Sequence, residues 1–178
     1  MTTQILIAGF GGQGVLFAGK LLAYKGMYDG KELSWLPSYG PEMRGGTANC
    51  SVIISDTPVG SPIVDKPDVL MVMNLPSLDK YENAVVKGGM IFVDSSFIER
   101  KVVREDVSAF YIPATKMAAE AGVPTLANVI LLGKMLKETQ VLDFEGRDGV
   151  FKKIVSAKRA DLIEANLKAL ELGYNYEG

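Results

Sequence analysis

The chain has 178 residues, of which 48% are apolar and 22% charged, and this composition is typical of one folded domain. It holds no histidine and one cysteine, Cys50, which excludes from this chain a Ser-His-Asp triad, a histidine-rich metal site, an internal disulfide and a four-cysteine iron–sulfur cluster. The 19 basic and 21 acidic side chains give a net charge of −2 without a basic block longer than two residues, so we expect no nucleic-acid partner.

The start of the chain predicts a strand, a glycine turn and a helix in succession. Residues 4–8 (QILIA) form a short, branched-rich apolar run, which is typical of a strand buried on both faces. The segment GFGGQG follows at 9–14, and the helical spacing of apolar residues from Gly14 onward predicts a helix that ends near Gly26.

The middle of the chain predicts strands separated by loops rich in Gly and Pro. Strands are expected at 32–36, 47–55, 68–73, 90–93 and 110–112, with a short strand at Val102 and Val103 and a helix at 77–86. Residues 47–55 alternate, so one face of their strand carries Ala48, Cys50, Val52 and Ile54.

The last third of the chain predicts helices, at 115–122, 126–139 and 156–173, and the second is apolar almost all round and therefore buried. No repeat or long linker separates parts of the chain. We therefore expect one domain, 1–178, of the α/β class: a Rossmann-like, mainly parallel sheet flanked by helices, with a helical C-terminal third.

The N-terminus lacks the basic start and cleavage site of a signal peptide, and no apolar run approaches the roughly 20 residues that span a bilayer. We expect a cytoplasmic protein with no membrane contact.

The glycine turn is the first candidate site. Gly9, Gly11 and Gly14 form GxGxxG between a predicted strand and a predicted helix, where glycine lets the backbone approach a pyrophosphate at the helix N-terminus. Gly12 adds flexibility, and Gln13 adds a side-chain amide that can bind a ligand. An equally weighted interpretation is that these glycines serve only helix–strand packing.

NAD is disfavoured as the ligand. A dinucleotide enzyme should carry an acidic residue at the carboxyl end of its second strand to hold the ribose hydroxyls. That end reads SWLPSYG here, with Glu32 at the strand's start and Glu42 in the following loop.

The loop at 38–46 (SYGPEMRGG) is the second candidate site. We expect it to leave a strand next to the first and so to share the sheet edge with the glycine turn. Its candidate binding residues are Ser38, Tyr39, Gly40, Arg44, Gly45 and Gly46, with Arg44 able to bind phosphate or carboxylate. The alternative, slightly favoured on the residues alone, is a covering loop in which Arg44 pairs with Glu42.

Other polar residues favour structural roles. Cys50 is expected to be a buried, inert thiol, and Asn128 to satisfy its amide on neighbouring backbone. Asp94, Ser95 and Ser96 follow a strand but are also common turn residues, and Lys152 and Lys153 suit a solvated helix face. No carboxylate pair or ligand cluster is spaced for chemistry, so we expect no catalytic residue and no metal site.

Four segments together carry a family resemblance. They read IAGFGGQGVLFAGKLLA, SYGPEMRGGTANCSVIISD, KPDVLMVMNLPSLDKYE with KGGMIFVDSS, and ANVILLGKML, and they run from about Ile5 to Leu136. In this order they resemble the gamma subunit of the 2-oxoacid:ferredoxin oxidoreductases. The string RGGTANC is closer to the 2-oxoglutarate type than to the pyruvate type.

The resemblance implies a division of labour between subunits. Such complexes decarboxylate a 2-oxoacid on thiamine diphosphate, pass electrons through iron–sulfur clusters to ferredoxin, and transfer the acyl group to coenzyme A. It implies partner alpha, beta and ferredoxin-like delta subunits, with thiamine diphosphate and Mg on the beta subunit and the clusters also on partners. This chain would hold no cofactor alone, would be inactive alone, and would assist assembly and contact coenzyme A, whose phosphates could meet the glycine turn and Arg44.

Two other functions stay open on the residues. One is a free-standing oxidoreductase that binds a nucleotide or NAD at the glycine turn. The other is a nucleotide-sensing or scaffold domain.

Overall fold

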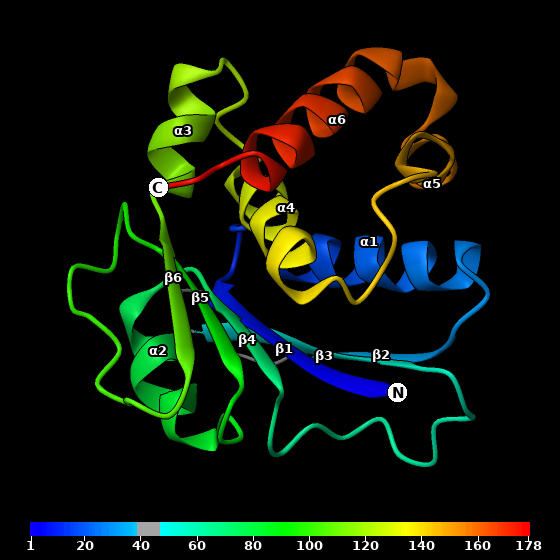
Figure 1. Ribbon diagram of the computed structural model, residues 1–178. Coiled ribbons are helices and arrows are strands. Elements are labelled where there is room, and N and C mark those ends of the chain that lie inside the picture. The colour runs from blue at the N-terminus through cyan, green and yellow to red at the C-terminus, as the bar shows by residue number, and fades with distance from the viewer. Residues whose placement is uncertain (39–46) are drawn as a thin grey trace.

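The computed structural model describes residues 1–38 and 47–178, which form a six-stranded sheet with helices on both faces (Figure 1). The strand order is β2-β3-β1-β4-β5-β6. The strands are β1 (Thr2–Phe10), β2 (Glu32–Ser38), β3 (Thr47–Ser55), β4 (Val69–Val72), β5 (Met90–Asp94) and β6 (Ser108–Ile112). The predicted α/β class is confirmed.

The sheet is mainly parallel, as predicted. β1, β4, β5 and β6 pair in parallel, and β3 is antiparallel to both of its neighbours, so five of the six strands run in one direction. One predicted neighbour was wrong: the strand at 32–36 does not lie beside the first strand. β3 lies between them and pairs with all nine residues of β1, from Thr2 opposite Ser55 to Phe10 opposite Thr47.

Most helices cover one face of the sheet, and a single helix lies on the other (Figure 1). The first group comprises α1 (Val15–Tyr28), α3 (Ala114–Glu120), α4 (Ala127–Thr139), α5 (Arg147–Ile154) and α6 (Ala160–Tyr174), with the short 3-10 turn η3 (Ala157–Arg159) before α6. The other face carries α2 (Leu75–Tyr81) and the 3-10 turn η2 (Glu82–Ala84). Alternate residues of the parallel strands point to opposite faces of the sheet, so they pack in two hydrophobic cores, one under each layer of helices.

The larger core forms around α4, whose residues from Ala127 to Leu136 are all buried, as the sequence predicts for that helix. α4 crosses α6 at two glycines, Gly133 and Gly173. A Cβ atom on Gly173 would overlap the carbonyl oxygen of Ile130, and one on Gly133 would overlap that of Leu170. The two backbones therefore approach more closely than any larger residue permits.

The smaller core lies under α2. Asn74 caps this helix, since its Oδ1 accepts a 2.9 Å hydrogen bond from the Ser77 N–H. The helix predicted at 77–86 thus begins two residues earlier, at Leu75, and gives way to η2 after Tyr81.

The short strand predicted at Val102 and Val103 does not form. The N–H of Val102 donates to the Tyr111 hydroxyl at 2.9 Å, and the N–H of Val103 donates to Glu82 Oε1 at 2.6 Å. Side chains take the place of a strand ladder here, so the segment runs as a loop. Among the described helices, none is long and apolar enough to cross a membrane.

Candidate functional site

The glycine turn joins the carboxyl end of β1 to the first turn of α1, and three of its glycines are required by geometry. Gly12 and Gly14 have φ of 93° and 76°, in the left-handed region that glycine favours. Gly14 is the N-cap residue of α1. Gly9 is crowded, because a Cβ atom there would lie 2.6 Å from Gln13 Oε1 and 3.1 Å from the Cβ of Met73. The turn thus exposes backbone at a helix N-terminus.

Gln13 braces this turn. Its Oε1 accepts a 2.7 Å hydrogen bond from the Phe10 N–H, and its Nε2 donates a 3.0 Å bond to the Met73 carbonyl at the end of β4. Both ends of the side-chain amide are therefore engaged within the protein. The residue predicted as a ligand contact holds the loop across two strands.

Asn128, near the start of α4, fixes the other side of the turn. Its Nδ2 donates a 2.9 Å hydrogen bond to the carbonyl oxygen of Gly14. The prediction that this buried amide is satisfied on backbone is confirmed for its nitrogen. Its Oδ1 finds no partner among the described residues.

A cavity of about 420 Å³ opens beside Gly14 and Asn128. Its remaining lining residues come from α1, from the two residues before α4, and from the stretch that runs from the end of α5 through η3 into α6: Phe17, Thr125, Leu126, Ile154, Val155, Ser156, Arg159, Leu162 and Asn166. Asn166 is 4% exposed, donates to the Leu162 carbonyl at 2.7 Å, and leaves its Oδ1 without a partner in the described part of the chain. The cavity is thus mostly apolar, and the oxygens of its two amide side chains are buried beneath its wall.

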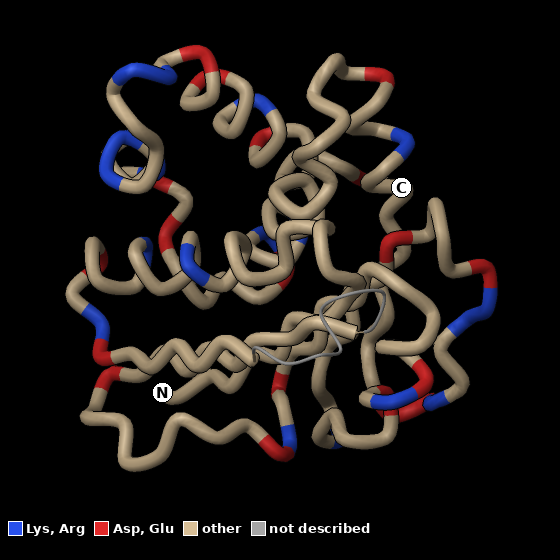
Figure 2. The backbone as a smooth tube through the Cα atoms, turned by 180° about the vertical axis from the view of Figure 1, so that it is seen from behind, with Lys and Arg blue, Asp and Glu red and all other residues tan. Residues whose placement is uncertain are grey.

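The side of the cavity formed by α5, η3 and the start of α6 is basic. Lys152, Lys153, Lys158 and Arg159 are all exposed, which confirms the solvated lysine face predicted on α5 (Figure 2). Arg159 lines the cavity and has one acidic partner, Asp161, at 3.4 Å. No residue that lines the cavity is acidic. Arg159 is thus the charged residue at the cavity wall, and Asp161 offsets part of its charge.

The second predicted site is only partly described. Tyr39, Gly40, Arg44, Gly45 and Gly46 lie outside the described residues, as does Glu42. Ser38 ends β2 opposite Asn49, and Thr47 begins β3 opposite Phe10. Both flanking residues therefore lie at the sheet edge where the glycine turn lies.

The arrangement of strands also bears on NAD. Glu32 is at the amino end of β2, opposite Ser55, and so lies at the far edge from the glycine turn. The strand beside β1 is β3, which starts at this edge with Thr47. The described residues thus place no acidic side chain at the end of a neighbouring parallel second strand, where a dinucleotide site needs one.

Two other polar residues are structural. Asp94 is fully buried and holds β5 against α3, because Thr115 Oγ1 donates to it at 2.6 Å and the Ser96 N–H donates at 3.1 Å. Cys50 is fully buried, and burial raises the pKa of its thiol to about 12, as expected for an inert cysteine. The described residues contain no group of His, Cys, Asp or Glu placed to hold a metal ion.

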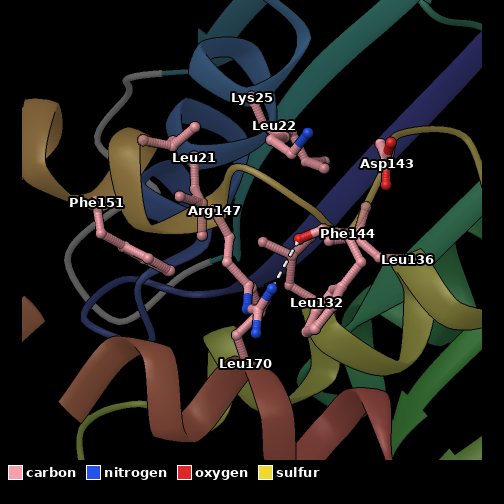
Figure 3. Close-up of a pocket in the computed structure, with 11 residues that line it drawn as sticks. Leu21, Leu22, Lys25, Leu132, Leu136, Asp143, Phe144, Arg147, Phe151 and Leu170 are labelled. Atoms are coloured by element: carbon pink, nitrogen blue, oxygen red, sulfur yellow. Dashed lines mark hydrogen bonds between the residues drawn. The ribbon is translucent and has the colours of Figure 1, made fainter. Parts of the chain in front are cut away.

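A second, much smaller cavity lies inside the helical layer (Figure 3). It has about 20 Å³ among residues of α1, α4, α5 and α6, including Leu21, Lys25 and Leu132. Arg147 closes it, with its guanidinium 4.1 Å from the Phe144 ring and bonded to the Phe144 carbonyl at 3.2 Å. This space suits one water molecule and not a substrate.

Comparison with known proteins identifies the family of the chain. Residues 4–176 match the family model described as pyruvate ferredoxin/flavodoxin oxidoreductase. The chain belongs to this family. It is 36% identical over 177 residues to the 2-oxoglutarate synthase subunit KorC of Methanocaldococcus jannaschii, covering 98% of this chain and 93% of that relative.

A longer relative contains the same domain. The ketoisovalerate oxidoreductase subunit VorA of Methanothermobacter marburgensis is 41% identical over 175 residues, which cover 97% of this chain and 36% of VorA. The chain therefore spans about a third of that relative's length.

Two solved structures share the family fold. A keto/oxoacid ferredoxin oxidoreductase gamma subunit from Geobacter sulfurreducens has a TM-score of 0.82 at 30% identity and covers 97% of this chain and 96% of that one. A 2-oxoglutarate:ferredoxin oxidoreductase from Magnetococcus marinus, with 2-oxoglutarate, coenzyme A and succinyl-CoA bound, has a TM-score of 0.87 at 22% identity. It covers 97% of this chain and 30% of that one. The predicted resemblance to gamma subunits is confirmed.

The geometry adds residues that sequence reasoning missed. Arg159 and Asn166 were not predicted as site residues, and Asn128 was predicted only as a satisfied amide. Asn128 and Asn166 share one signal in the sequence, an amide side chain within a predicted helix. Arg159 has no such signal.

Proposed function

We propose that this chain is the noncatalytic gamma subunit of a 2-oxoglutarate:ferredoxin oxidoreductase. The observation that carries the substrate type is the 36% identity with KorC along almost the full length of both chains, against 28% with the common gamma subunit of the pyruvate/ketoisovalerate oxidoreductases of Thermococcus litoralis, which also matches almost end to end. The VorA match covers a third of the longer protein. The string RGGTANC at 44–50 points in the same direction.

The proposed complex oxidatively decarboxylates its 2-oxoacid to an acyl-CoA and passes the electrons to ferredoxin. Thiamine diphosphate with Mg would be held by a beta subunit and the iron–sulfur clusters by a ferredoxin-like delta subunit, with an alpha subunit completing the assembly. The chemistry of this chain supports that division, because one buried cysteine cannot ligate a four-cysteine cluster. Its own part would be to assist assembly and to bind coenzyme A, in the cytoplasm.

The cavity beside the glycine turn is the proposed contact for coenzyme A. Its apolar walls suit a pantetheine chain. Arg159 and the neighbouring lysines supply positive charge for phosphates, and the start of α1 adds backbone N–H groups. Support also comes from the structural neighbour that has coenzyme A bound.

The test is steady-state kinetics of the assembled complex with Arg159→Ala. We expect the KM for coenzyme A to rise several-fold to tenfold while the KM for the 2-oxoacid stays constant, because the guanidinium would contact only the coenzyme. Lys66→Ala is the matched control, since Lys66 is exposed in the loop before β4 and distant from the cavity. An unchanged KM for coenzyme A in Arg159→Ala would remove this residue from the site.

The substrate type is tested separately on the wild-type complex. We expect the ratio kcat/KM for 2-oxoglutarate to exceed those for pyruvate and 2-ketoisovalerate by at least tenfold. A preference for 2-ketoisovalerate would overturn the proposed type and leave the family unchanged.

A further inference from the structure

The carboxyl ends of β1 and β4 form a topological switch point of the sheet. These two strands are parallel neighbours, with Ala8 opposite Val72 near their ends. β1 continues through the glycine turn into α1 on one face of the sheet, whereas β4 continues into α2 on the other face (Figure 1). Open α/β sheets bind their ligands in the crevice between two connections that leave in opposite directions. A nucleotide bound in this way would place its pyrophosphate between the glycine turn and Met73.

The side-chain amide of Gln13 spans this crevice. Phe10 is the last residue of β1, and its N–H donates to Gln13 Oε1 at 2.7 Å. Met73 directly follows β4, where its N–H donates to the Ala8 carbonyl at 2.9 Å and its carbonyl accepts from Gln13 Nε2 at 3.0 Å. A backbone donor at the end of β1, of the kind that binds a phosphate, is therefore already bonded to the protein.

Amides of the chain also fill the space beside two glycines of the GxGxxG sequence. In a dinucleotide site such glycines let the backbone approach the pyrophosphate and let the helix pack on the strand. Here a Cβ atom on Gly9 would lie 2.6 Å from Gln13 Oε1, and one on Gly14 would overlap the side-chain amide of Asn128. These two glycines therefore make room for groups of the chain itself.

We propose that Gln13 is a specificity-determining residue that closes the glycine turn to nucleotides. Its amide oxygen takes the hydrogen bond that Phe10 would otherwise donate to a pyrophosphate, and a ligand could enter the crevice only by breaking both hydrogen bonds of the Gln13 amide. The excluded class comprises NAD, FAD and nucleoside diphosphates, whose pyrophosphates bind at glycine turns of this kind. The inference does not depend on the proposed function.

The closed crevice is separate from the 420 Å³ cavity. Among the described turn residues 9–14, only Gly14 lines that cavity, together with residues of the helical layer such as Phe17 and Leu162. The crevice lies instead between the ends of two strands, at Phe10 and Met73. A ligand in the cavity and a ligand in the crevice would contact different residues, so an experiment can tell them apart.

The test is an NMR titration of the isotope-labelled 178-residue chain with ADP, in the wild type and in Gln13→Ala. In the wild type we expect the amide signals of Phe10 and Met73 to stay unchanged up to about 5 mM ADP. In Gln13→Ala both signals should shift, with a dissociation constant at least about tenfold below that limit, because ADP no longer has to break two hydrogen bonds. Signals of Val155 and Leu162 report ADP in the cavity, since these residues line it.

Two further variants control the titration. In Gln13→Glu the carboxylate still accepts from the Phe10 N–H and repels a phosphate, so the crevice should stay closed. Gln4→Ala is the matched control, because it is the same substitution near the amino end of β1, and it should behave as the wild type. Circular dichroism melting must show that each variant is folded.

Hydrogen exchange of the wild-type chain gives a readout that needs no variant. Phe10 is 41% exposed and ends its strand, yet its N–H is bonded to Gln13. We therefore expect its amide to exchange slowly, both without ADP and with ADP in excess. Rapid exchange of this amide would contradict the closure even if Gln13→Ala did not fold.

Two results of the titration would overturn the inference. One is saturable binding of ADP to the wild type that shifts Phe10 and Met73, because the crevice would then be open. The other is a folded Gln13→Ala in which ADP leaves both signals unchanged, because another group would then exclude the nucleotide. Neither result changes the coenzyme A kinetics of the assembled complex, which test the proposed function.

Discussion

The side-chain amide of Asn128 donates a 2.9 Å hydrogen bond to the carbonyl oxygen of Gly14, which is 114 residues earlier in the chain. The bond joins the start of α4 to the start of α1. It fixes the carbonyl of Gly14 and places Asn128 at the wall of the 420 Å³ cavity. A local turn is thus positioned by a distant helix.

Asn128→Ala should destabilise the fold and disturb the turn. The Gly14 carbonyl keeps its helical bond from the Ala18 N–H at 3.0 Å but loses its side-chain donor, so we expect a loss of about 1–2 kcal/mol in the free energy of unfolding. Urea denaturation measures this loss. Asn175→Ala is the control, because Asn175 is exposed after α6 and should change stability by no more than about 0.5 kcal/mol. Equal stability of the two variants would show that the bond contributes nothing.

Gly173→Ala should be among the most damaging single substitutions. The added methyl group would overlap the Ile130 carbonyl at the crossing of α4 and α6, and we expect a loss of about 3 kcal/mol or more. Gly60→Ala is the matched control, since Gly60 has open space around its Cβ position and no positive φ. Thermal melting should separate the two variants clearly, and a Gly173→Ala protein with wild-type Tm would show that the crossing is not tight.

Cys50 should be unreactive in the folded chain at about pH 8. Burial raises the pKa of its thiol from 9.0 to about 12, so the reactive thiolate is suppressed until the protein unfolds. Labelling with a thiol reagent should be slow in buffer and should reach one thiol per chain in denaturant. Because the folded pKa is the higher one, this group's contribution to stability is complete below about pH 9 and is lost as the pH rises toward 12. Rapid labelling of the folded protein would contradict the burial of this residue.

Glu82→Ala should loosen the loop that follows β5. Glu82 is 3% exposed. Its carboxylate accepts a 2.7 Å hydrogen bond from the Arg100 guanidinium and a 2.6 Å hydrogen bond from the Val103 N–H. The substitution leaves both donors without this acceptor. We expect a loss of about 3 kcal/mol and faster proteolysis between residues 99 and 105. Glu82→Gln should lose less, because an amide oxygen still accepts a hydrogen bond. Glu105→Gln serves as the control, because Glu105 is exposed. Equal proteolysis of all three variants would show that the hydrogen bonds of Glu82 do not hold this loop.

Much of the architecture follows from the sequence because it is locally encoded. Short apolar runs or alternating apolar residues predict the strands, the helical period predicts α1, α4 and α6, and GFGGQG predicts the turn, since left-handed backbone at Gly12 and Gly14 favours glycine. Composition was equally informative: without histidine and with one cysteine, the chain by itself cannot form a Ser-His-Asp triad, an internal disulfide or a four-cysteine iron–sulfur cluster.

The tertiary structure decided what long-range pairing controls. The sequence of residues 32–55 does not indicate whether β2 or β3 lies beside β1, because the neighbour of a strand depends on which pairing buries both faces of the sheet. The hydrogen bond of Gln13 to the Met73 carbonyl joins residues 60 positions apart, and the cavity exists only where α4 and the start of α6 meet the glycine turn. Sequence by itself determined most of the elements and the family. Packing between segments more than a hundred residues apart determined the site, because local periodicity carries no information about such contacts.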